Sequence, residues 1–301
     1  QDLPVGLVGM VQGAGVDVGV ALVRHPLIAA GAFTGSTRGG AALQAEANAR
    51  PRPIPFYGEL GSINPVVALP AALQAKGAEL ATTLAGSIVQ GCGQFCTNPG
   101  LIVLIDGAEA DAFVAQLSTA LAAQTPHAML TSGMRRAFDA GVARFVEHGA
   151  QALVQQPGSA QAPGPQLLQV SGAQFLKESA LHDEVFGPSS LIVRAASIAE
   201  VLAVLAAVGG SLTVTVWGAD AESDDTRALV RGAMAIAGRV LFAGVPTGVA
   251  VTAAQQHGGP WPASTAPMTT SVGDAALDRF LRPVSLQDAP AWLLARSGRP
   301  C

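Results

Sequence analysis

Apolar residues in this chain fall into short continuous runs that alternate with longer amphipathic or alanine-rich segments. Short runs bounded by Gly, Pro and Ser predict buried strands, whereas longer periodic segments predict helices. We predict strands at residues 5–11, 27–33, 56–60, 66–69, 101–105, 151–156, 166–170, 173–175, 190–194, 212–217 and 240–242. We predict helices at residues 17–24, 41–49, 69–90, 111–123, 134–148, 198–207, 224–237 and 274–282, with irregular chain at 248–268. This alternation predicts an α/β fold with parallel sheets and crossover helices.

The composition indicates a globular protein and argues against nucleic-acid and membrane partners. Half of the 301 residues are hydrophobic and only 13% are charged, which argues for a large core and against disorder. The formal charge of −4 and the absence of a basic cluster predict no nucleic-acid partner. No apolar run reaches the roughly 18 residues that cross a bilayer, so we expect no membrane partner. Three cysteines, one of them terminal, do not make a disulfide framework, and we expect a reducing, cytoplasmic setting.

Cys96 lies on a short glycine-flanked connection between a predicted helix and a predicted strand. Gly91 and Gly93 end the helix before it, and the apolar run 101–105 follows it. A loop held between rigid neighbours is a common position for a reactive group. The sequence therefore makes this loop a candidate site.

The surroundings of Cys96 leave two interpretations open. No charged residue occurs between Glu79 and Asp106, so an apolar environment would raise the pKa of the thiol and keep it neutral. A nucleophilic role then needs a base or a positive dipole from elsewhere in the chain. The alternative is a buried structural cysteine, since free cysteine is among the most buried residue types.

A glycine- and serine-rich loop at residues 34–40 joins a predicted strand to a predicted helix. Free N–H groups at such a helix start, with its positive dipole end, suit an anion or a phosphate. Ser36 could equally be an ordinary N-cap. An earlier pattern, Gly13-x-Gly15-x-x-x-Gly19, has its third glycine one position late for a dinucleotide fingerprint, so we interpret it as a turn.

Acidic residues offer further chemistry at two places. Glu59 lies near the end of a short predicted strand, where it could face solvent or act as a general base. His182, Asp183 and Glu184 form a polar cluster, but adjacent side chains alternate in direction and do not easily share one ion. With no His/Cys pair at ligand spacing, we predict no metal site.

Four short motifs, in one order along the chain, resemble the aldehyde dehydrogenase superfamily. They are Phe33-Thr34-Gly35-Ser36, Glu59-Leu60-Gly61 with Asn64-Pro65, Gly93-Gln94-Phe95-Cys96-Thr97, and Glu184-x-Phe186-Gly187-Pro188. Within the superfamily, the stretches 56–65, 93–100, 246–249, 257–260 and 279–284 are similar to α-ketoglutarate semialdehyde (2,5-dioxovalerate) dehydrogenases. The resemblance implies NAD(P)-dependent oxidation of an aldehyde to a carboxylate, with a keto-acid semialdehyde as the substrate.

The resemblance also implies residue roles. Cys96 would attack the aldehyde carbon and carry a thioester, and Glu59 would activate the hydrolytic water and help to deprotonate the thiol. Residues 257–262 would border the substrate mouth, and Cys92 would be structural. NADP or NAD would lie against a second set: Gly35 and Ser36 at the pyrophosphate, Leu60 and Phe186 near the nicotinamide, and Glu184 at the nicotinamide ribose.

The resemblance implies a longer N-terminal half, which we expect this chain to lack. That half carries the positions that choose between NAD and NADP and an asparagine of the oxyanion hole. We expect residues 1–60 to be the C-terminal remnant of a Rossmann-type cofactor domain and residues 61–265 to be a complete catalytic (thiol) domain. Residues 266–301 would be a return segment with an oligomerisation strand. We expect a truncated, impaired chain whose full-length form is a homodimer or homotetramer.

Two other functions stay open at this point. One is a non-catalytic remnant that folds but binds cofactor poorly. The other is a cysteine hydrolase that uses Cys96 and a distant histidine, which would cleave esters without a nucleotide. The anchor for a substrate carboxylate is not assigned either, because Arg38, Arg135 and Arg282 are candidates by charge alone.

Overall fold

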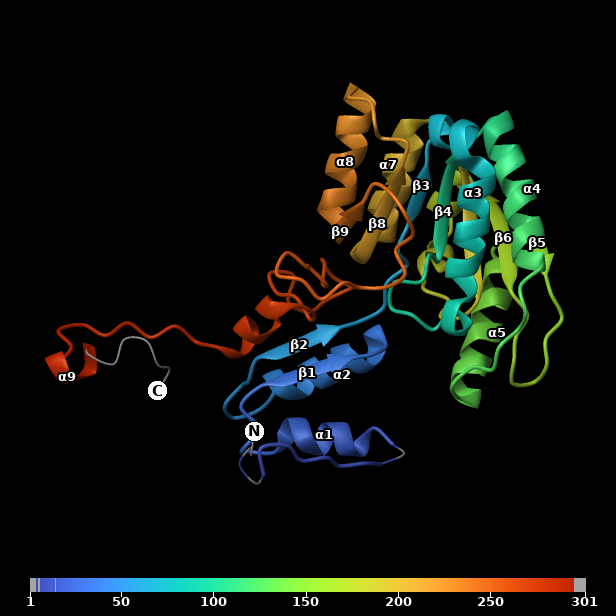
Figure 1. Cartoon of the computed structure of the whole chain (residues 1–301). Helices are drawn as coiled ribbons and strands as arrows, with labels where there is room; N and C mark the ends of the chain where they lie inside the picture. Colours follow the sequence, from blue (N-terminus) through green and yellow to red (C-terminus); the bar gives the residue numbers. More distant parts are fainter. Residues whose placement is uncertain (1–3, 5, 14, 295–301) are drawn as a thin grey trace.

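A seven-stranded sheet forms the centre of the molecule (Figure 1). The computed structural model describes residues 4, 6–13 and 15–294. The strand order is β5-β6-β7-β4-β3-β8-β9, and every neighbouring pair is parallel except β5 with β6. The strands are β3 (Val66–Ala68), β4 (Leu101–Ile105), β5 (Gln151–Gln155), β6 (Gln166–Ser171), β7 (Ser189–Ala195), β8 (Ser211–Trp217) and β9 (Ala237–Leu241).

Helices cover both faces of this sheet, which explains why its strands are continuous apolar runs. On β4, Ile102 packs with the residues of one hydrophobic cluster and Val103 with those of the other. The first cluster contains Leu84 and Phe113, and the second contains Phe175. One face is covered by α3 (Pro70–Val89) and α4 (Ala108–Ala122), and the other by α5 (Ser132–Glu147), α6 (Gly172–Lys177), α7 (Ile198–Val208) and α8 (Asp224–Ile236).

A smaller unit precedes the large sheet and lies below it in Figure 1. Its two parallel strands have their own small core, which contains Val23, Ala47, Ile54 and Phe56. The predicted α/β fold with parallel strands and crossover helices is confirmed in both units, whereas the boundaries at residues 60 and 265 stay predictions. The elements of the smaller unit are α1 (Asp17–Arg24), β1 (Gly31–Thr34), α2 (Thr37–Asn48) and β2 (Phe56–Glu59).

The irregular chain after β9 returns to the small unit and lies along the free edge of β2. Leu60 N–H donates to Ala263 O at 2.8 Å, and Thr265 N–H donates to Gly58 O at 3.0 Å. Strand β2 is therefore flanked by β1 on one side and by this return segment on the other. This pairing brings the C-terminal part of the chain to the end of β2, where Glu59 lies.

Three predicted elements are wrong. Of the strand predicted at residues 5–11, residue 5 lies outside the described residues, and residues 6–11 form turns and open chain that no described segment pairs with. Residues 173–175 belong to helix α6, which Ser171 caps by accepting from Gln174 N–H, so the local cap prevails over the apolar pattern. The predicted helix 274–282 is a 3-10 turn over Asp274–Phe280.

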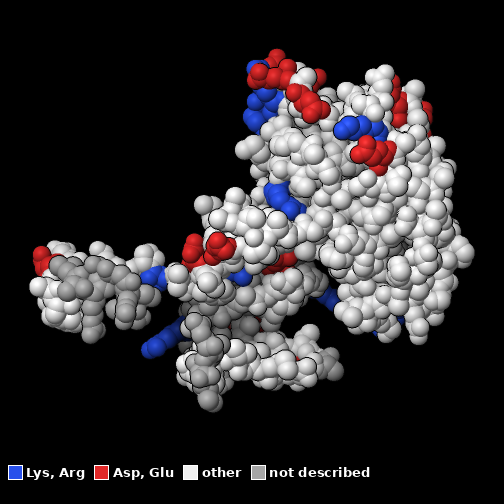
Figure 2. All heavy atoms as spheres, viewed as in Figure 1, with Lys and Arg blue, Asp and Glu red and all other residues white. Residues whose placement is uncertain are grey.

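Charged side chains are thinly spread over the face seen in Figure 2. They gather where α8 begins, and there Arg227 pairs with Glu222 at 2.9 Å and with Asp224 at 3.1 Å. Acidic and basic groups at this end therefore compensate one another. Within the described ranges, no helix is both long enough and apolar enough to cross a bilayer.

Candidate active site

The loop that carries Cys96 is shaped by glycines in left-handed backbone conformations. Helix α3 ends at Val89, and the next turn contains Gly91 at φ 57° and Gly93 at φ 65°. The predicted role of these two glycines in ending the helix is confirmed. A Cβ on Gly93 would overlap Gly187 O, so two loops pack backbone to backbone here.

Asn64 fixes this loop to the sheet. It is fully buried, with φ 53°, and its Nδ2 donates to Cys96 O and Asn98 O at 2.9 Å each. Its Oδ1 accepts from Ser62 Oγ at 2.7 Å and from Thr213 Oγ1 at 3.1 Å. The sequence motif contained Asn64 but indicated no role for it. The structure shows that one amide holds the Cys96 loop against β3 and β8.

The structure brings Cys96, Glu59 and His257 together. His257 Nε2 lies 3.4 Å from Cys96 Sγ and 3.3 Å from Glu59 Oε1. The three ligand atoms all lie within 4.8 Å of one another. His257 is 2% exposed and Glu59 is 7% exposed, whereas Cys96 is half-buried and reaches a pocket. This group supplies the base that the uncharged neighbourhood of Cys96 lacks.

The electrostatics of this group keep the thiol neutral and the carboxylate ionised. Burial raises the pKa of the Cys96 thiol to about 11, and the neighbouring Glu59 charge adds to the effect. Burial acts to raise the pKa of Glu59 as well, but hydrogen bonds from His257 and Ser271 outweigh it and leave that pKa below its usual value. The expectation of a neutral thiol is thus confirmed. Glu59 is a proton acceptor within reach of it.

His257 is the residue whose contact the sequence did not predict. We expected residues 257–262 to border the substrate mouth, but the His257 ring lies against the sulfur itself. Ionised Glu59 only accepts hydrogen bonds, so its 3.3 Å contact with His257 is a hydrogen bond when Nε2 carries a proton. His257 Nδ1 has no partner among the described residues. The motif His257-Gly258-Gly259-Pro260 was the available signal.

A pocket of about 320 Å³ opens beside this group. Its volume suits a small ligand. Side chains from β1, β2 and the return segment form its wall, so three distant parts of the sequence build one site. The lining residues are Ala32, Phe33, Thr34, Tyr57, Glu59, Cys96, Val249, His257, Ser271, Val272 and Arg279.

The predicted pyrophosphate residues lie at the start of α2. This helix begins at Thr37 instead of residue 41, because Ser36 caps it by accepting from Gly39 N–H at 3.2 Å. Ser36 is thus an N-cap, and it is exposed together with Gly35. Leu60 is 4% exposed and packs so tightly on α2 that a Cβ on Gly40 would overlap it. Contacts of these residues with a cofactor stay predictions.

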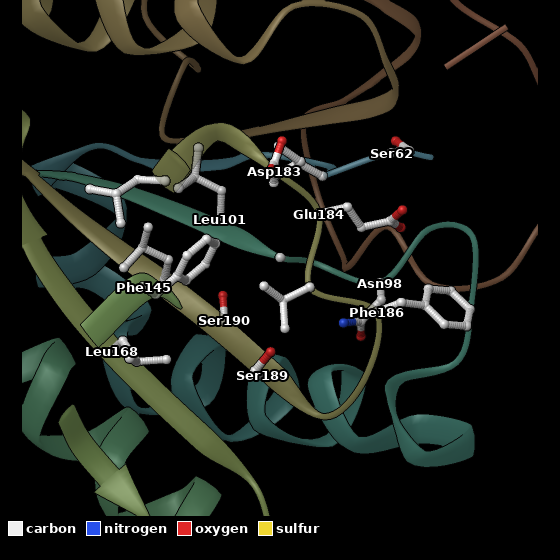
Figure 3. A pocket seen from close by; sticks show the side chains of 15 residues that line it. Ser62, Asn98, Leu101, Phe145, Leu168, Asp183, Glu184, Phe186, Ser189 and Ser190 are labelled. Carbon is white, nitrogen blue, oxygen red and sulfur yellow. The ribbon is translucent and has the colours of Figure 1, made fainter. Parts of the chain in front are cut away.

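Glu184 and Phe186 lie at one end of a narrow pocket of about 20 Å³ (Figure 3). Burial raises the pKa of Glu184 to about 7, against the effect of a hydrogen bond from the Ser62 backbone. A Cβ on Gly61 would come within 2.8 Å of both Glu184 Oε2 and Thr37 Oγ1. The missing Cβ therefore lets this carboxylate approach the start of α2. A carboxylate beside a helix start fits a ligand that carries both hydroxyls and phosphates.

His182 and Asp183, which precede Glu184 in the sequence, contact other residues. His182 Nε2 contacts Phe175 O at 2.7 Å, and Asp183 pairs with Arg144 at 3.3 Å. These three adjacent side chains do not converge, as their alternating directions predicted. The described residues whose types and spacing could hold a metal ion are instead Glu59, Cys96 and His257.

Comparison with known proteins identifies the family. The model of the Aldehyde dehydrogenase family matches residues 1–259. This chain belongs to the aldehyde dehydrogenase family. Its thiol, carboxylate and glycine-flanked loops all lie inside the matched region.

Two curated relatives cover almost the whole of this aldehyde dehydrogenase chain. Alpha-ketoglutaric semialdehyde dehydrogenase 2 of Azospirillum brasilense is 45% identical over 97% of the chain. Alpha-ketoglutaric semialdehyde dehydrogenase of Acinetobacter baylyi is 40% identical over 97%. The chain spans 56% of the length of each relative. The expected resemblance to enzymes of this name is confirmed.

A solved structure shows the same aldehyde dehydrogenase fold. The NAD-dependent aldehyde dehydrogenase of Sinorhizobium meliloti superposes with a TM-score of 0.73 at 22% identity. The match covers 94% of this chain and 56% of that one. The two units and the return segment together therefore form a recognisable part of an aldehyde dehydrogenase.

Proposed function

We propose that this protein oxidises an aldehyde to a carboxylate, with NAD or NADP as the hydride acceptor, through a thioester on Cys96. The observation that carries the proposal is the convergence of Cys96 Sγ, His257 Nε2 and a Glu59 carboxylate oxygen within 4.8 Å of one another. They lie at the wall of one pocket. Membership of the aldehyde dehydrogenase family supports it.

The residues of the site would act in two steps. Glu59 takes the proton of the Cys96 thiol while the sulfur bonds to the aldehyde carbon. A bound nicotinamide would accept hydride from that carbon and leave a thioester. Glu59 releases this first proton to solvent and then takes a proton from water, whose oxygen attacks the thioester carbon. The C–S bond breaks to release the acid, and the second proton returns to the Cys96 sulfur. His257 and Ser271 hold the carboxylate in place by hydrogen bonds throughout.

The cofactor would lie along the start of α2. Gly35 and Ser36 are exposed there, and the Glu184 carboxylate approaches it across Gly61. We assign Leu60 and Phe186 to the nicotinamide end and Glu184 to the ribose. The turnover experiment below distinguishes NAD from NADP, because it follows the formation of NADH and of NADPH.

The proposed substrate is a keto-acid semialdehyde, with 2,5-dioxopentanoate giving 2-oxoglutarate. The names of both curated relatives support this choice. We also propose that the protein assembles as a homodimer or homotetramer through its last segment. There Leu281, Val284 and Leu286 are each more than half exposed.

Turnover by matched cysteine variants tests the proposal. NADH or NADPH formation is followed with 2,5-dioxopentanoate for the wild type, Cys96→Ser and Cys92→Ser. Cys92 is buried, and its thiol donates to His127 O at 3.1 Å, so it is the structural control. We expect Cys96→Ser to lose at least about 10³-fold in kcat and Cys92→Ser to retain activity. Equal activity of Cys96→Ser and wild type would overturn the assignment.

A cysteine hydrolase is the second candidate, favoured by the 3.4 Å contact between Cys96 Sγ and His257 Nε2. It predicts that 4-nitrophenyl acetate is cleaved at Cys96 without any nucleotide, while aldehydes reduce neither NAD nor NADP. Titration of both nucleotides, with alkylation of Cys96 as the readout, separates this function from the dehydrogenase and from a remnant that binds no cofactor.

A further inference from the structure

The pocket beside Cys96 has a guanidinium in its wall. Arg279, on the 3-10 turn Asp274–Phe280, lines the same pocket as Cys96 and Glu59. The side chain is half-buried, and its Nε is buried without a hydrogen-bond partner among the described residues. Arginine keeps its charge at all ordinary pH values. A buried charge is costly unless it is paired, so this cation favours an anionic partner in the pocket.

Aromatic rings rather than carboxylates hold Arg279 in place. Its Cζ lies 5.6 Å from the centroid of the Tyr57 ring and 5.1 Å from that of Phe280. These two rings meet edge to face, with centroids 5.4 Å apart. Stacking on aromatic faces orients a guanidinium without neutralising it. None of the ion pairs among the described residues includes Arg279.

The arginines suggested by charge alone do not line this pocket. Arg135 pairs with Asp139 at 2.8 Å and donates to Ser159 O at 2.6 Å. Arg38 and Arg282 are exposed. None of these three arginines belongs to the wall around Cys96. The structure therefore shifts attention to a residue that the sequence did not single out.

We infer that Arg279 binds the carboxylate of the substrate whose aldehyde carbon Cys96 attacks. This inference rests on the proposed function. Ionised Glu59 in the same wall repels an anionic substrate. The fixed guanidinium of Arg279 offsets that repulsion by attracting the substrate's carboxylate, at the end away from its aldehyde. The planar guanidinium can bind a carboxylate with two parallel hydrogen bonds. Arg279 would thus select acid-bearing aldehydes over neutral ones.

Protection of the Cys96 thiol tests the inference without turnover. Iodoacetamide labels Cys96, and the labelled peptide is quantified while 2-oxoglutarate or its neutral dimethyl ester competes. In the wild type, we expect 2-oxoglutarate to protect at lower concentrations than the ester. We define a protection ratio as the concentration of 2-oxoglutarate that gives half-protection, divided by the corresponding concentration of the ester. In Arg279→Met this ratio should rise roughly 10- to 100-fold. Arg279→Lys should recover part of the preference, which also guards against a variant that folds poorly.

Arg282→Met is the matched control, because this exposed arginine lies three positions further along the same segment. It should leave the ratio at its wild-type value. The inference fails if Arg279→Met keeps the wild-type ratio or if Arg282→Met changes it equally. A tenfold loss of NADP affinity in Arg279→Met, with unchanged protection by 2-oxoglutarate, would assign this cation to the cofactor and overturn the inference.

Turnover separates this inference from the proposed function. The ratio of kcat/KM for 2,5-dioxopentanoate to that for pentanal should fall roughly 10- to 100-fold in Arg279→Met, with the loss in KM. If the wild type oxidises neither aldehyde, the proposed function fails. The labelling experiment then still shows whether Arg279 binds a carboxylate in this pocket. If it oxidises both and the ratio is unchanged, only the role of Arg279 fails.

Discussion

The carboxylate of Glu59 has opposite effects on the thiol at the residue scale. It is the group that can take the proton of Cys96, yet its charge also raises the pKa of that thiol. A thiolate formed beside an ionised carboxylate is destabilised and therefore basic and reactive. The site favours transfer of the proton in concert with attack over storage of a resting thiolate.

Removal of the Glu59 charge should accelerate alkylation of Cys96 while it slows turnover. In Glu59→Gln the thiol pKa falls towards its ordinary value. A fall of one unit gives about tenfold more thiolate at pH 8. The second-order rate of iodoacetamide labelling at Cys96, measured from pH 7 to pH 10, reports this shift. We expect a three- to tenfold faster reaction at pH 8, on the order expected for a shift of up to one unit.

Glu46→Gln provides the control for this measurement, because Glu46 lies on α2 and pairs with Arg24 at 2.6 Å. It should label at the wild-type rate. Slower labelling of Glu59→Gln than of wild type would show instead that Glu59 promotes the resting thiolate.

Sequence motifs predicted part of this residue-scale picture. Cys96 and Glu59 were identified from short motifs, and the structure brings them together. The contact of His257 with the sulfur joins positions 161 residues apart, and it depends on how the return segment pairs with β2. Arg279 was missed for the same reason. Both residues lie in stretches that resemble α-ketoglutarate semialdehyde dehydrogenases, 257–260 and 279–284, but the motifs alone do not show which side chains reach the pocket.

At the element scale, glycines decide whether the Cys96 loop can take its conformation. Gly93 needs a positive φ and leaves no room for a Cβ beside Gly187. Gly86 lies within α3, where a Cβ would meet nothing within 4 Å. The same substitution should therefore have opposite effects at two positions seven residues apart in the sequence.

Gly86→Ala should stabilise the chain by about 0.5–1 kcal/mol, because alanine is the better helix former and loses less entropy. Gly93→Ala should destabilise it by about 2 kcal/mol or more, because left-handed strain and overlap with Gly187 O add together. Urea unfolding of both variants measures the two free energies. Only Gly93→Ala should also change the rate at which iodoacetamide labels Cys96. A stabilised Gly93→Ala would contradict the close packing of the two loops.

The elements themselves were predictable where burial on both faces leaves a continuous apolar run. Residues 101–105 became β4 with the bounds expected, and 17–24 became α1. The strand predicted at 173–175 failed because Ser171 supplies a helix cap. An apolar run alone does not say whether a partner strand exists, which is why residues 6–11 also failed.

At the scale of the whole molecule, the site depends on the junction of two sheets. The first sheet supplies Glu59 at the end of β2, and the loop before β4 of the second sheet supplies Cys96. The alternating pattern predicted both sheets but not their junction. That junction is formed by the backbone pairing of residues 263–265 with β2, where side-chain type matters little. Figure 1 shows the return segment between the two units.

Glu184 lies between the two units, beside Gly61 and the start of α2, and its burial makes the stability of the folded chain depend on pH. Its pKa in the folded chain is about 7, above the ordinary 4.5, because burial disfavours the charge. Between these two values the folded chain holds a proton that the unfolded chain has lost. Stability contributed at this position is therefore present at low pH and is lost as the pH rises from 4.5 to about 7. Partial exposure limits the loss to roughly 1–2 kcal/mol.

Glu184→Gln should remove this dependence. The free energy of unfolding in urea, compared between variant and wild type, should favour the variant by about 1–2 kcal/mol more at pH 8 than at pH 5. Glu178→Gln is the control, because the hydrogen bond from His148 holds the pKa of Glu178 below its ordinary 4.5. This carboxyl is therefore ionised in the folded and the unfolded chain from pH 5 to pH 8 and should add no trend there. If Glu184→Gln and wild type keep a constant difference from pH 5 to pH 8, Glu184 is hydrated in the folded chain. The carboxylate would then not be held, desolvated, at the start of α2, and its proposed contact with the ribose would lose its physical basis.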